Sequence, residues 1–238
     1  MLTLPVRLAD RSRTPAPPTI PGAFRGSSPG ASAGRPFHHG AMTPTHKIRL
    51  ATADDVPAIH GLIGSAAEWL QKFTDQWARP WPDKPTRDAR IEQAIQDRLT
   101  WMVADGEGAL VGTVTCREHG NDMLWTPEEQ AEPAVYVSRL IVRRDRAGLG
   151  IGSALIDWAG LHGSRNWGAE WIRVDVWTTN NALHDYYKGE GFEHLRTLQF
   201  KNYWDYPSAA LFHKPTADVD TDAAARFSSV EEASLVTR

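Results

Sequence analysis

The spacing of apolar residues along the chain predicts four helices. Between residues 52 and 73, Val56, Ile59 and Ile63 recur at helical intervals, and Thr52 opens this segment with a Thr-x-x-Asp capping box. The other three predicted helices cover about residues 87–98, the segment from a glycine-rich loop to residue 165, and residues 180–191. Gly191 ends the last of them.

Shorter apolar segments bounded by turn residues predict the strands. They cover residues 47–52, 99–105, 109–118, 133–142, 170–177, 192–200 and 208–214. Two strand–helix–strand units in the second half need crossover connections, which implies parallel pairing there, whereas the "GEG" hairpin in the first half is antiparallel. The pattern therefore predicts an α/β fold with a mixed sheet.

Composition divides the chain into one ordered domain, residues 47–214, and two polar ends. Residues 1–46 are rich in Pro, Gly and Arg and nearly free of acids. We expect them to be disordered, because they cannot bury enough apolar surface to offset the entropy of ordering. An organellar transit peptide, or an extension upstream of a natural start at Met42, are two further explanations. Residues 215–238 are predicted to be a polar tail.

Charge and cysteine content narrow the class of protein. The 238 residues are 41% hydrophobic and 23% charged, as in globular proteins, and no apolar run approaches the roughly 20 residues that span a bilayer. A single cysteine, Cys116, favours a cytoplasmic protein. Six of the 26 Lys and Arg residues lie in the first 47 positions, but only one of the 29 Asp and Glu residues does. The rest is acidic, which argues against a nucleic-acid partner and favours a cationic small substrate.

Three alternate glycines, Gly148, Gly150 and Gly152, lie between the strand 133–142 and the next helix. The first turn of a helix presents N–H groups without partners and a partial positive charge, and glycines let a bulky anion reach them. Three arginines just upstream add positive charge. This arrangement suits a phosphate or pyrophosphate; the alternative is a tight strand–helix turn without a ligand.

The glycine spacing discriminates between kinds of phosphate loop. A Walker loop needs a lysine after its last glycine, and none follows here. A dinucleotide loop needs Gly-x-Gly-x-x-Gly, and the third glycine comes one residue early. Asp175, at the end of the next strand, could imitate the ribose-binding acid of a dinucleotide site, so a Rossmann fold is the alternative at this point.

Two motifs resemble those of the GNAT-type N-acetyltransferases. "LIVRRDRAGLGIGSALIDWA" is similar to the family's acetyl-CoA motif, Gln/Arg-x-x-Gly-x-Gly/Ala after an apolar strand, with Ala147 where Gln or Arg is usual. "TNNALHDYYKGEGF" is similar to Asn-x-x-Ala-x-x-x-Tyr-x-x-x-Gly-Phe, with Asn180, Leu183 and Tyr187 at the first three places. Asn180 and Tyr187 lie two helical turns apart and share a face, whereas Tyr186 points about 100° away and is expected to pack.

The resemblance implies how acetyl-CoA would bind. In the family's fold, a mixed and mostly antiparallel sheet has helices on both faces, and the strand before the glycine loop splays from the next one. The pantetheine arm lies in that gap against backbone groups, and the pyrophosphate sits on the N–H groups of the loop. The residues expected to bind acetyl-CoA are Leu140, Ile141, Val142, Gly148, Leu149, Gly150, Ile151, Gly152, Ser153, Asn180 and Tyr187. No metal is expected.

Tyr187 is the expected catalytic residue. Acetyl transfer leaves a thiolate that needs a proton, and a tyrosine with a pKa of about 10 is protonated at neutral pH and can supply it. A backbone N–H around residues 140–142 would stabilise the oxyanion. The general base is not identified; Glu132, His119 and Asp122 are candidates that we expect to be ordinary surface residues.

Trp77, Trp81 and Asp83 lie between the first two helices, where members of the family commonly wall the acceptor site. A cation could bind there, although we expect these side chains mainly to pin the loop. We interpret the chain as a cytoplasmic enzyme that transfers the acetyl group of acetyl-CoA to a primary amine of a small molecule or peptide, by direct attack in a ternary complex. No membrane partner is expected, and similar proteins often form homodimers. A non-catalytic acetyl-CoA sensor is the alternative.

Overall fold

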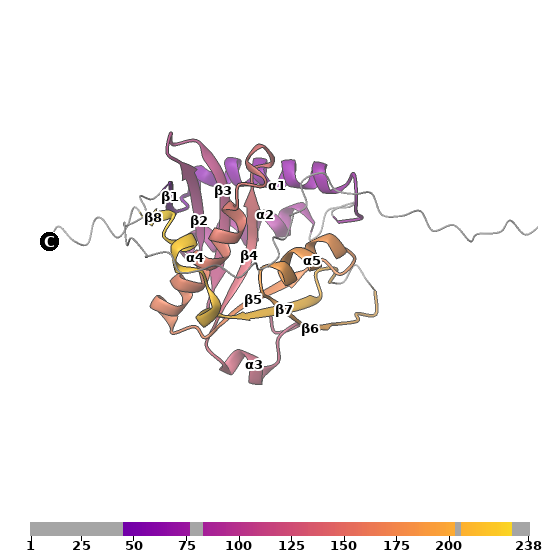
Figure 1. Cartoon of the computed structure of the whole chain (residues 1–238). Coiled ribbons are helices and arrows are strands. Elements are labelled where there is room, and N and C mark those ends of the chain that lie inside the picture. The colour runs from indigo at the N-terminus through magenta and orange to yellow at the C-terminus, as the bar shows by residue number, and fades with distance from the viewer. Residues whose placement is uncertain (1–44, 77–82, 203–205, 230–238) are drawn as a thin grey trace, which may run out of the picture. The chain divides into compact units, whose positions relative to one another are not determined.

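The computed structural model describes residues 45–76, 83–202 and 206–229. Among these residues, one sheet contains eight strands in the order β6-β7-β5-β4-β3-β2-β1-β8 (Figure 1). The strands are β1 His46–Leu50, β2 Thr100–Asp105, β3 Leu110–Arg117, β4 Ala134–Val142, β5 Trp171–Val176, β6 Glu193–Thr197, β7 Ala210–Pro215 and β8 Phe227–Ser229.

The sheet is mixed, as the sequence predicts. Strands β4 and β5 are parallel at its centre, β1 and β8 are parallel at one edge, and the other neighbours are antiparallel. The pairing of β4 with β5 runs from Ala134–Trp171 to Tyr136–Arg173 and then stops. The central pair is thus joined at one end and parted at the other.

Helices cover both faces of the sheet (Figure 1). They are α1 Val56–Leu70, α2 Lys84–Gln96, α3 Pro127–Ala131, α4 Ile151–Trp167, α5 Asn181–Gly189 and α6 Thr221–Ala224. Helices α4 and α5 pack on one face around a core that includes Leu155, and α1 and α2 pack on the other around Ile59 and Ile91. None of the helices in the described part of the chain is both long and apolar enough to cross a bilayer.

Two glycines set how closely α4 approaches the strands. A Cβ atom at Gly163 would lie 2.6 Å from Cβ of Val135 on β4, and one at Gly160 would lie 2.6 Å from Cδ1 of Ile172 on β5. Only glycine lets the helix backbone come this close without displacing the strand residues. This packing holds the C-terminal half of α4 against the joined end of the β4–β5 pair.

The predicted Thr52–Asp55 capping box is present and starts the 3-10 turn Ala53–Asp55 that leads into α1. The Asp55 carboxylate accepts a hydrogen bond from the Thr52 N–H at 2.8 Å and pairs with Arg49 at 2.7 Å. The hydrogen bond from Arg49 is the main reason why the pKa of Asp55 falls to about 2. The second helix begins three residues earlier than predicted, because Asp83 accepts from the Thr86 N–H at 3.1 Å and acts as its N-cap.

The structure differs from the prediction in two segments. The loop 121–132 contains the short helix α3, which a Thr126–Glu129 capping box starts. The segment after residue 214, predicted to be a polar tail, continues through a 3-10 turn, α6 and β8. The sequence pattern did not predict structure here because the segment has few apolar residues. Within residues 215–229, the fully buried apolar side chains in the core are those of Ala224 and Phe227. The predictions for residues 1–44 and 230–238 lie outside the described residues.

Candidate active site

The glycine loop holds backbone donors at the start of α4. Gly148 has a φ of 80° and Gly150, the N-cap of α4, has a φ of 69°, both in the left-handed region that favours glycine. Among the described residues, no backbone carbonyl accepts a hydrogen bond from the N–H groups of residues 148–153. The predicted loop residues Leu149 and Ile151 therefore contribute backbone groups; the Leu149 side chain is exposed and that of Ile151 is buried in the core.

Tyr186 reaches the same turn of α4, contrary to the expectation that it only packs. A Cβ atom at Gly152 would lie 3.0 Å from the Tyr186 hydroxyl oxygen. Burial is the main cause that raises the pKa of Tyr186, and a hydrogen bond with the Ser153 hydroxyl opposes this rise; the same hydroxyl donates to Glu190 at 2.6 Å. Sequence spacing placed Tyr186 on another helical face, but the close approach of α5 to α4 brings its long side chain to the loop.

Arg226, from the segment predicted to be a tail, holds the other side of the loop. Its guanidinium donates to the carbonyl oxygens of Leu149 at 3.2 Å and Gly150 at 3.4 Å. The Arg226 carbonyl accepts from the N–H groups of Thr45 and His46, at 3.0 Å each. The C-terminal segment thus connects the glycine loop with β1, and no local sequence signal indicates this contact.

Two of the three arginines upstream of the glycines are paired with an acid. Arg143 pairs with Asp145 at 2.5 Å and donates to the Leu110 carbonyl at 3.0 Å. Arg146 pairs with Asp105 at 3.0 Å. These contacts turn the two guanidinium groups toward β2 and β3, so the loop offers an anion mainly its backbone N–H groups and the helix dipole.

A pocket of about 640 Å³ lies between α1 and the end of β4. Leu62, Leu110 and Val142 contribute apolar surface to it, and Trp69 and Arg144 lie beside them. The Arg144 guanidinium lies 3.7 Å from the centroid of the Trp69 ring, a cation–π distance. The end of β4, where Val142 was predicted to contact the coenzyme, therefore borders open space.

A bulge in β4 accompanies the parting of β4 from β5. In the register with β3, Thr115 faces Ser138 but Thr113 faces Ile141, so β4 holds one extra residue in between. Arg139 has a φ of 48°, which is rare for a residue with a side chain. Beyond the bulge, Ile141 and Val142 of the predicted coenzyme-binding residues 140–142 pair with β3, and within the described ranges none of the three pairs with β5. Their edge toward β5 is therefore open to an extended ligand.

Tyr187 lies in the core beside the glycine loop. Only 9% of its surface is exposed, and its ring makes edge contacts with Phe192 and Tyr186. Burial is the main cause that raises the pKa of the Tyr187 hydroxyl far above its usual range, and Asp175 is the next. The hydroxyl is thus protonated at neutral pH, which a proton donor requires.

Asn180 is buried, with its side chain employed in the protein itself. Its side-chain oxygen accepts from the Leu183 N–H at 3.1 Å, which caps α5, and its amide nitrogen donates to Gln76 at 2.6 Å. Its neighbour Thr179 donates to Asp75. These bonds join the loop after α1 to the start of α5, so Asn180 holds two elements together beside the gap.

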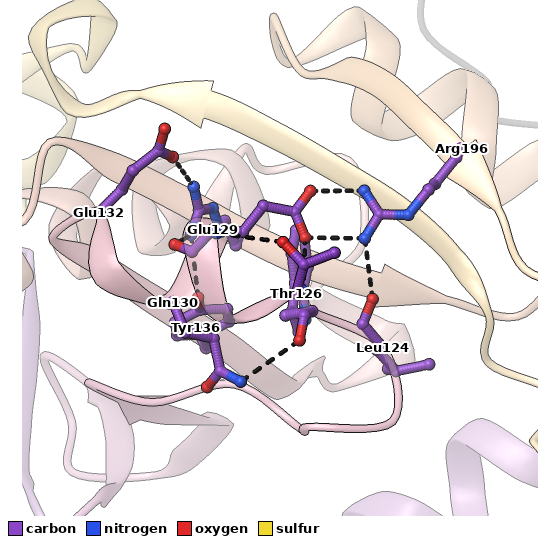
Figure 2. A network of polar contacts seen from close by, with 9 residues as sticks. Leu124, Thr126, Glu129, Gln130, Glu132, Tyr136 and Arg196 are labelled. Carbon is purple, nitrogen blue, oxygen red and sulfur yellow. Dashed lines mark hydrogen bonds and ion pairs between the residues drawn. The ribbon is translucent and has the colours of Figure 1, made fainter.

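The structure places the candidate bases away from the gap or in other contacts. Glu132 pairs with Arg173 in a polar network that also joins Glu129 to Arg196 (Figure 2). Asp122 accepts from the Gln130 amide at 2.9 Å, and His119 is exposed. The network holds α3 against β5 and β6, a structural role.

The predicted acceptor residues are only partly described. Asp83 is exposed and caps α2, whereas Trp77 and Trp81 lie outside the described residues. Asp175, considered above only as a possible ribose-binding acid, lies on β5 at the gap, and burial raises its pKa to about 6. In the described part of the chain, no group of three or more His, Cys, Asp and Glu side chains could hold a metal ion.

Known proteins resemble the chain in sequence and fold. It is 28% identical over 150 residues to the uncharacterized N-acetyltransferase YesJ of Bacillus subtilis, an alignment that covers 61% of this chain and 80% of YesJ. A GNAT-family acetyltransferase structure from Listeria monocytogenes matches with a TM-score of 0.55 at 24% identity, covering 71% of this chain and 94% of that one. A variant of the spermidine N-acetyltransferase SpeG from Vibrio cholerae matches with a TM-score of 0.51 at 15% identity, covering 73% and 95%. These two likenesses concern the fold.

The sequence model of the acetyltransferase (GNAT) family matches residues 66–192. This range includes the glycine loop, the parted β4–β5 pair and the helix that carries Tyr187. The fold, the loop geometry and the family match agree, and the chain belongs to the GNAT family of acetyltransferases.

Proposed function

We propose that this protein is an N-acetyltransferase that transfers the acetyl group of acetyl-CoA to a primary amine, by direct attack in a ternary complex. The observation that carries the proposal is the row of N–H groups at residues 148–153. In the part of the chain that the structure describes, these donors lack backbone acceptors; they lie at the positive end of a 17-residue helix and adjoin the open edge of β4. A pyrophosphate attached to an extended arm fits this combination.

Backbone groups would bind most of the coenzyme. The N–H groups of the loop would hold the pyrophosphate, while Tyr186 and Arg226 keep the loop in shape from its two sides. The edge of residues 140–142 would pair with the pantetheine arm as an additional strand does. The same edge supplies an N–H donor for the oxyanion that forms at the thioester carbonyl.

The chemical step follows from these positions. The neutral amine attacks the thioester carbonyl carbon, a C–N bond forms and the C–S bond breaks. The departing thiolate takes the proton of the Tyr187 hydroxyl, which its raised pKa keeps protonated at neutral pH, and the proton that the amine nitrogen loses returns to the Tyr187 oxygen through solvent, so that the products are the amide and free coenzyme A. Tyr187 is therefore our candidate general acid.

A panel of primary amines with acetyl-CoA, read by release of free thiol, tests this function. We expect acetylation of at least one amine. The rate should saturate with both substrates, and the kinetics should show that both must bind before coenzyme A is released. Tight binding of acetyl-CoA without thiol release for any amine, peptides included, would instead support a non-catalytic sensor.

A further inference from the structure

Three guanidinium groups gather on the side of the β4–β5 gap that faces α2. Arg117 lies on β3 opposite Tyr136, whose side chain packs on this face of the sheet with Trp125. Arg139 lies in the β4 bulge, and Arg90 comes from α2. The strand register and the bulge thus bring together cations that lie far apart in the sequence.

The environment of these groups is positive and poorly solvated. The pKa of Arg139 is lowered to about 10, mainly by burial and then by the charges of Arg117 and Arg90. Burial also lowers the pKa of Arg117; Asp97, the next cause, raises it, and Arg90 lowers it. Positive charges from three neighbouring elements attract an anion.

Two acids lie near the cluster. Asp97, at the end of α2, acts on Arg117 and accepts a hydrogen bond from Gln93 at 2.8 Å. Asp175 on β5 acts on both Arg117 and Arg139. The cluster thus holds three cations and two carboxylates. Of the two acids, only Asp175 acts on Arg139. The part of the cluster at the bulge therefore has excess positive charge.

The bulge also contains buried polar atoms without partners. Nη1 of Arg139 and Oγ of Ser138 are both buried, and neither has a hydrogen-bond partner among the described residues. Buried donors are almost always paired in native proteins, so an unpaired guanidinium nitrogen indicates a missing acceptor. The left-handed backbone at Arg139 is a strained conformation of the kind found at ligand sites.

The cluster borders the place where the reaction would occur. The Tyr187 ring lies 6.2 Å from that of Phe212, which pairs with Val174 next to Asp175, and the Asp175 carboxylate is, after burial, the largest cause of the raised pKa of Tyr187. Asp175 is also the acid whose charge acts on Arg139. A molecule bound between Arg139 and Asp175 would therefore lie beside the candidate general acid.

We propose that the acceptor is a primary amine that also carries an anionic group, a carboxylate or a phosphate. Arg139 and Arg117 would bind the anionic group, and the Asp175 carboxylate would accept a hydrogen bond from the amino group. The inference rests on the proposed function and specifies its substrate class. It reverses the expectation from net charge: the body of the chain is acidic, but the charge at the gap is positive, and a polycation would be repelled there.

Matched amines test the substrate class. Phenylalanine, phenylalaninamide and phenethylamine share a side chain and differ in the carboxylate; O-phosphoethanolamine and ethanolamine do the same for phosphate; spermidine is the polycation. A charge-assisted hydrogen bond predicts a kcat/KM roughly 10- to 100-fold higher for an anionic amine than for its neutral partner. The better of the two anionic series identifies the group. Equal or better use of the neutral amines or of spermidine would overturn the inference.

Calorimetry on the enzyme with bound coenzyme A keeps this test independent of turnover. If the anionic amines bind no more tightly than their neutral partners, the inference fails even if acetylation is observed. If acetyl-CoA does not bind and no amine gives thiol release, the proposed function is contradicted. Selective binding of anionic amines would in that case still support the anion-binding site at Arg139 and Arg117.

Arg139→Asn removes the cation and suits the backbone, because Asn tolerates a positive φ. We expect kcat/KM for the preferred anionic amine to fall roughly tenfold or more, with the neutral partner unaffected. Arg139→Lys retains the charge and should retain most of the preference. Arg165→Gln removes one charge from the exposed last turn of α4 and should change neither amine. An equal loss for anionic and neutral amines in Arg139→Asn would mean that Arg139 only supports the fold.

Discussion

The two sides of the β4–β5 gap present different kinds of binding group. On the α4 side, the donors are backbone N–H groups of one continuous segment, residues 148–153. On the α2 side, the polar groups are charged side chains from separate elements: the guanidinium donors of Arg90, Arg117 and Arg139 and the carboxylate of Asp175. The first kind is specified by glycine conformation and helix geometry, and the second by strand register.

This difference explains what each side can be used for. A backbone cradle depends on the path of the chain and not on side-chain identity, so it suits a ligand common to a whole family. A set of side chains from four elements can change residue by residue while the fold stays the same, which suits a ligand that differs between relatives. Variants that act on one side of the gap only test whether the two sides bind different ligands.

The largest effect is expected from Gly150→Glu. A carboxylate in the cradle would repel the pyrophosphate, and the φ of 69° adds strain for any residue with a side chain. Acetyl-CoA binding should be lost in calorimetry. Gly150→Asn is the matched control, since Asn accepts this backbone conformation without a charge, and it should bind far better. Unchanged affinity in Gly150→Glu would mean that the loop does not hold phosphate.

A smaller effect is expected from Arg226→Gln. The variant loses the charged hydrogen bonds to the Leu149 and Gly150 carbonyls, which are long and half-exposed. The Kd of acetyl-CoA should rise about threefold to tenfold, with little change in the preference among amines. The same measurement on Arg165→Gln, at the other end of α4, controls for net charge. If Arg226→Gln changed the amine preference instead, the two sides of the gap would not be separable.

The smallest effect is expected from deleting residues 1–41. Their composition predicts disorder, so the melting temperature and the acetyl-CoA affinity should both stay within error of those of the full chain. A drop of several degrees in the melting temperature would show that this segment packs on the domain.

Patterns of residues that are neighbours in the sequence predicted much of this architecture. They did not predict the contacts between residues that are distant in the sequence. The mixed sheet and the glycine loop follow from periodicity and from residues adjacent in the chain. The contact of Arg226 with the loop spans 76 residues, and the cluster at Arg139 depends on a one-residue bulge that no residue type marks. Tyr186 escaped detection because helical spacing describes one helix, whereas its contact depends on how α5 packs against α4.

The role of Tyr187 tests the account most directly, because it lies where the two sides of the gap meet. Tyr187→Phe keeps the ring contacts with Phe192 but removes the proton donor, so acetyl-CoA affinity should be retained. General acid catalysis contributes roughly 10²–10⁴-fold, so kcat should fall by at least about tenfold even if water substitutes in part. Tyr186→Phe is the matched control: its hydroxyl supports the loop, so its effect should fall mainly on the KM for acetyl-CoA. In a single-turnover measurement with an accepted amine, the account predicts slow chemistry in Tyr187→Phe alone. Equal rates for Tyr187→Phe and the wild type would contradict it.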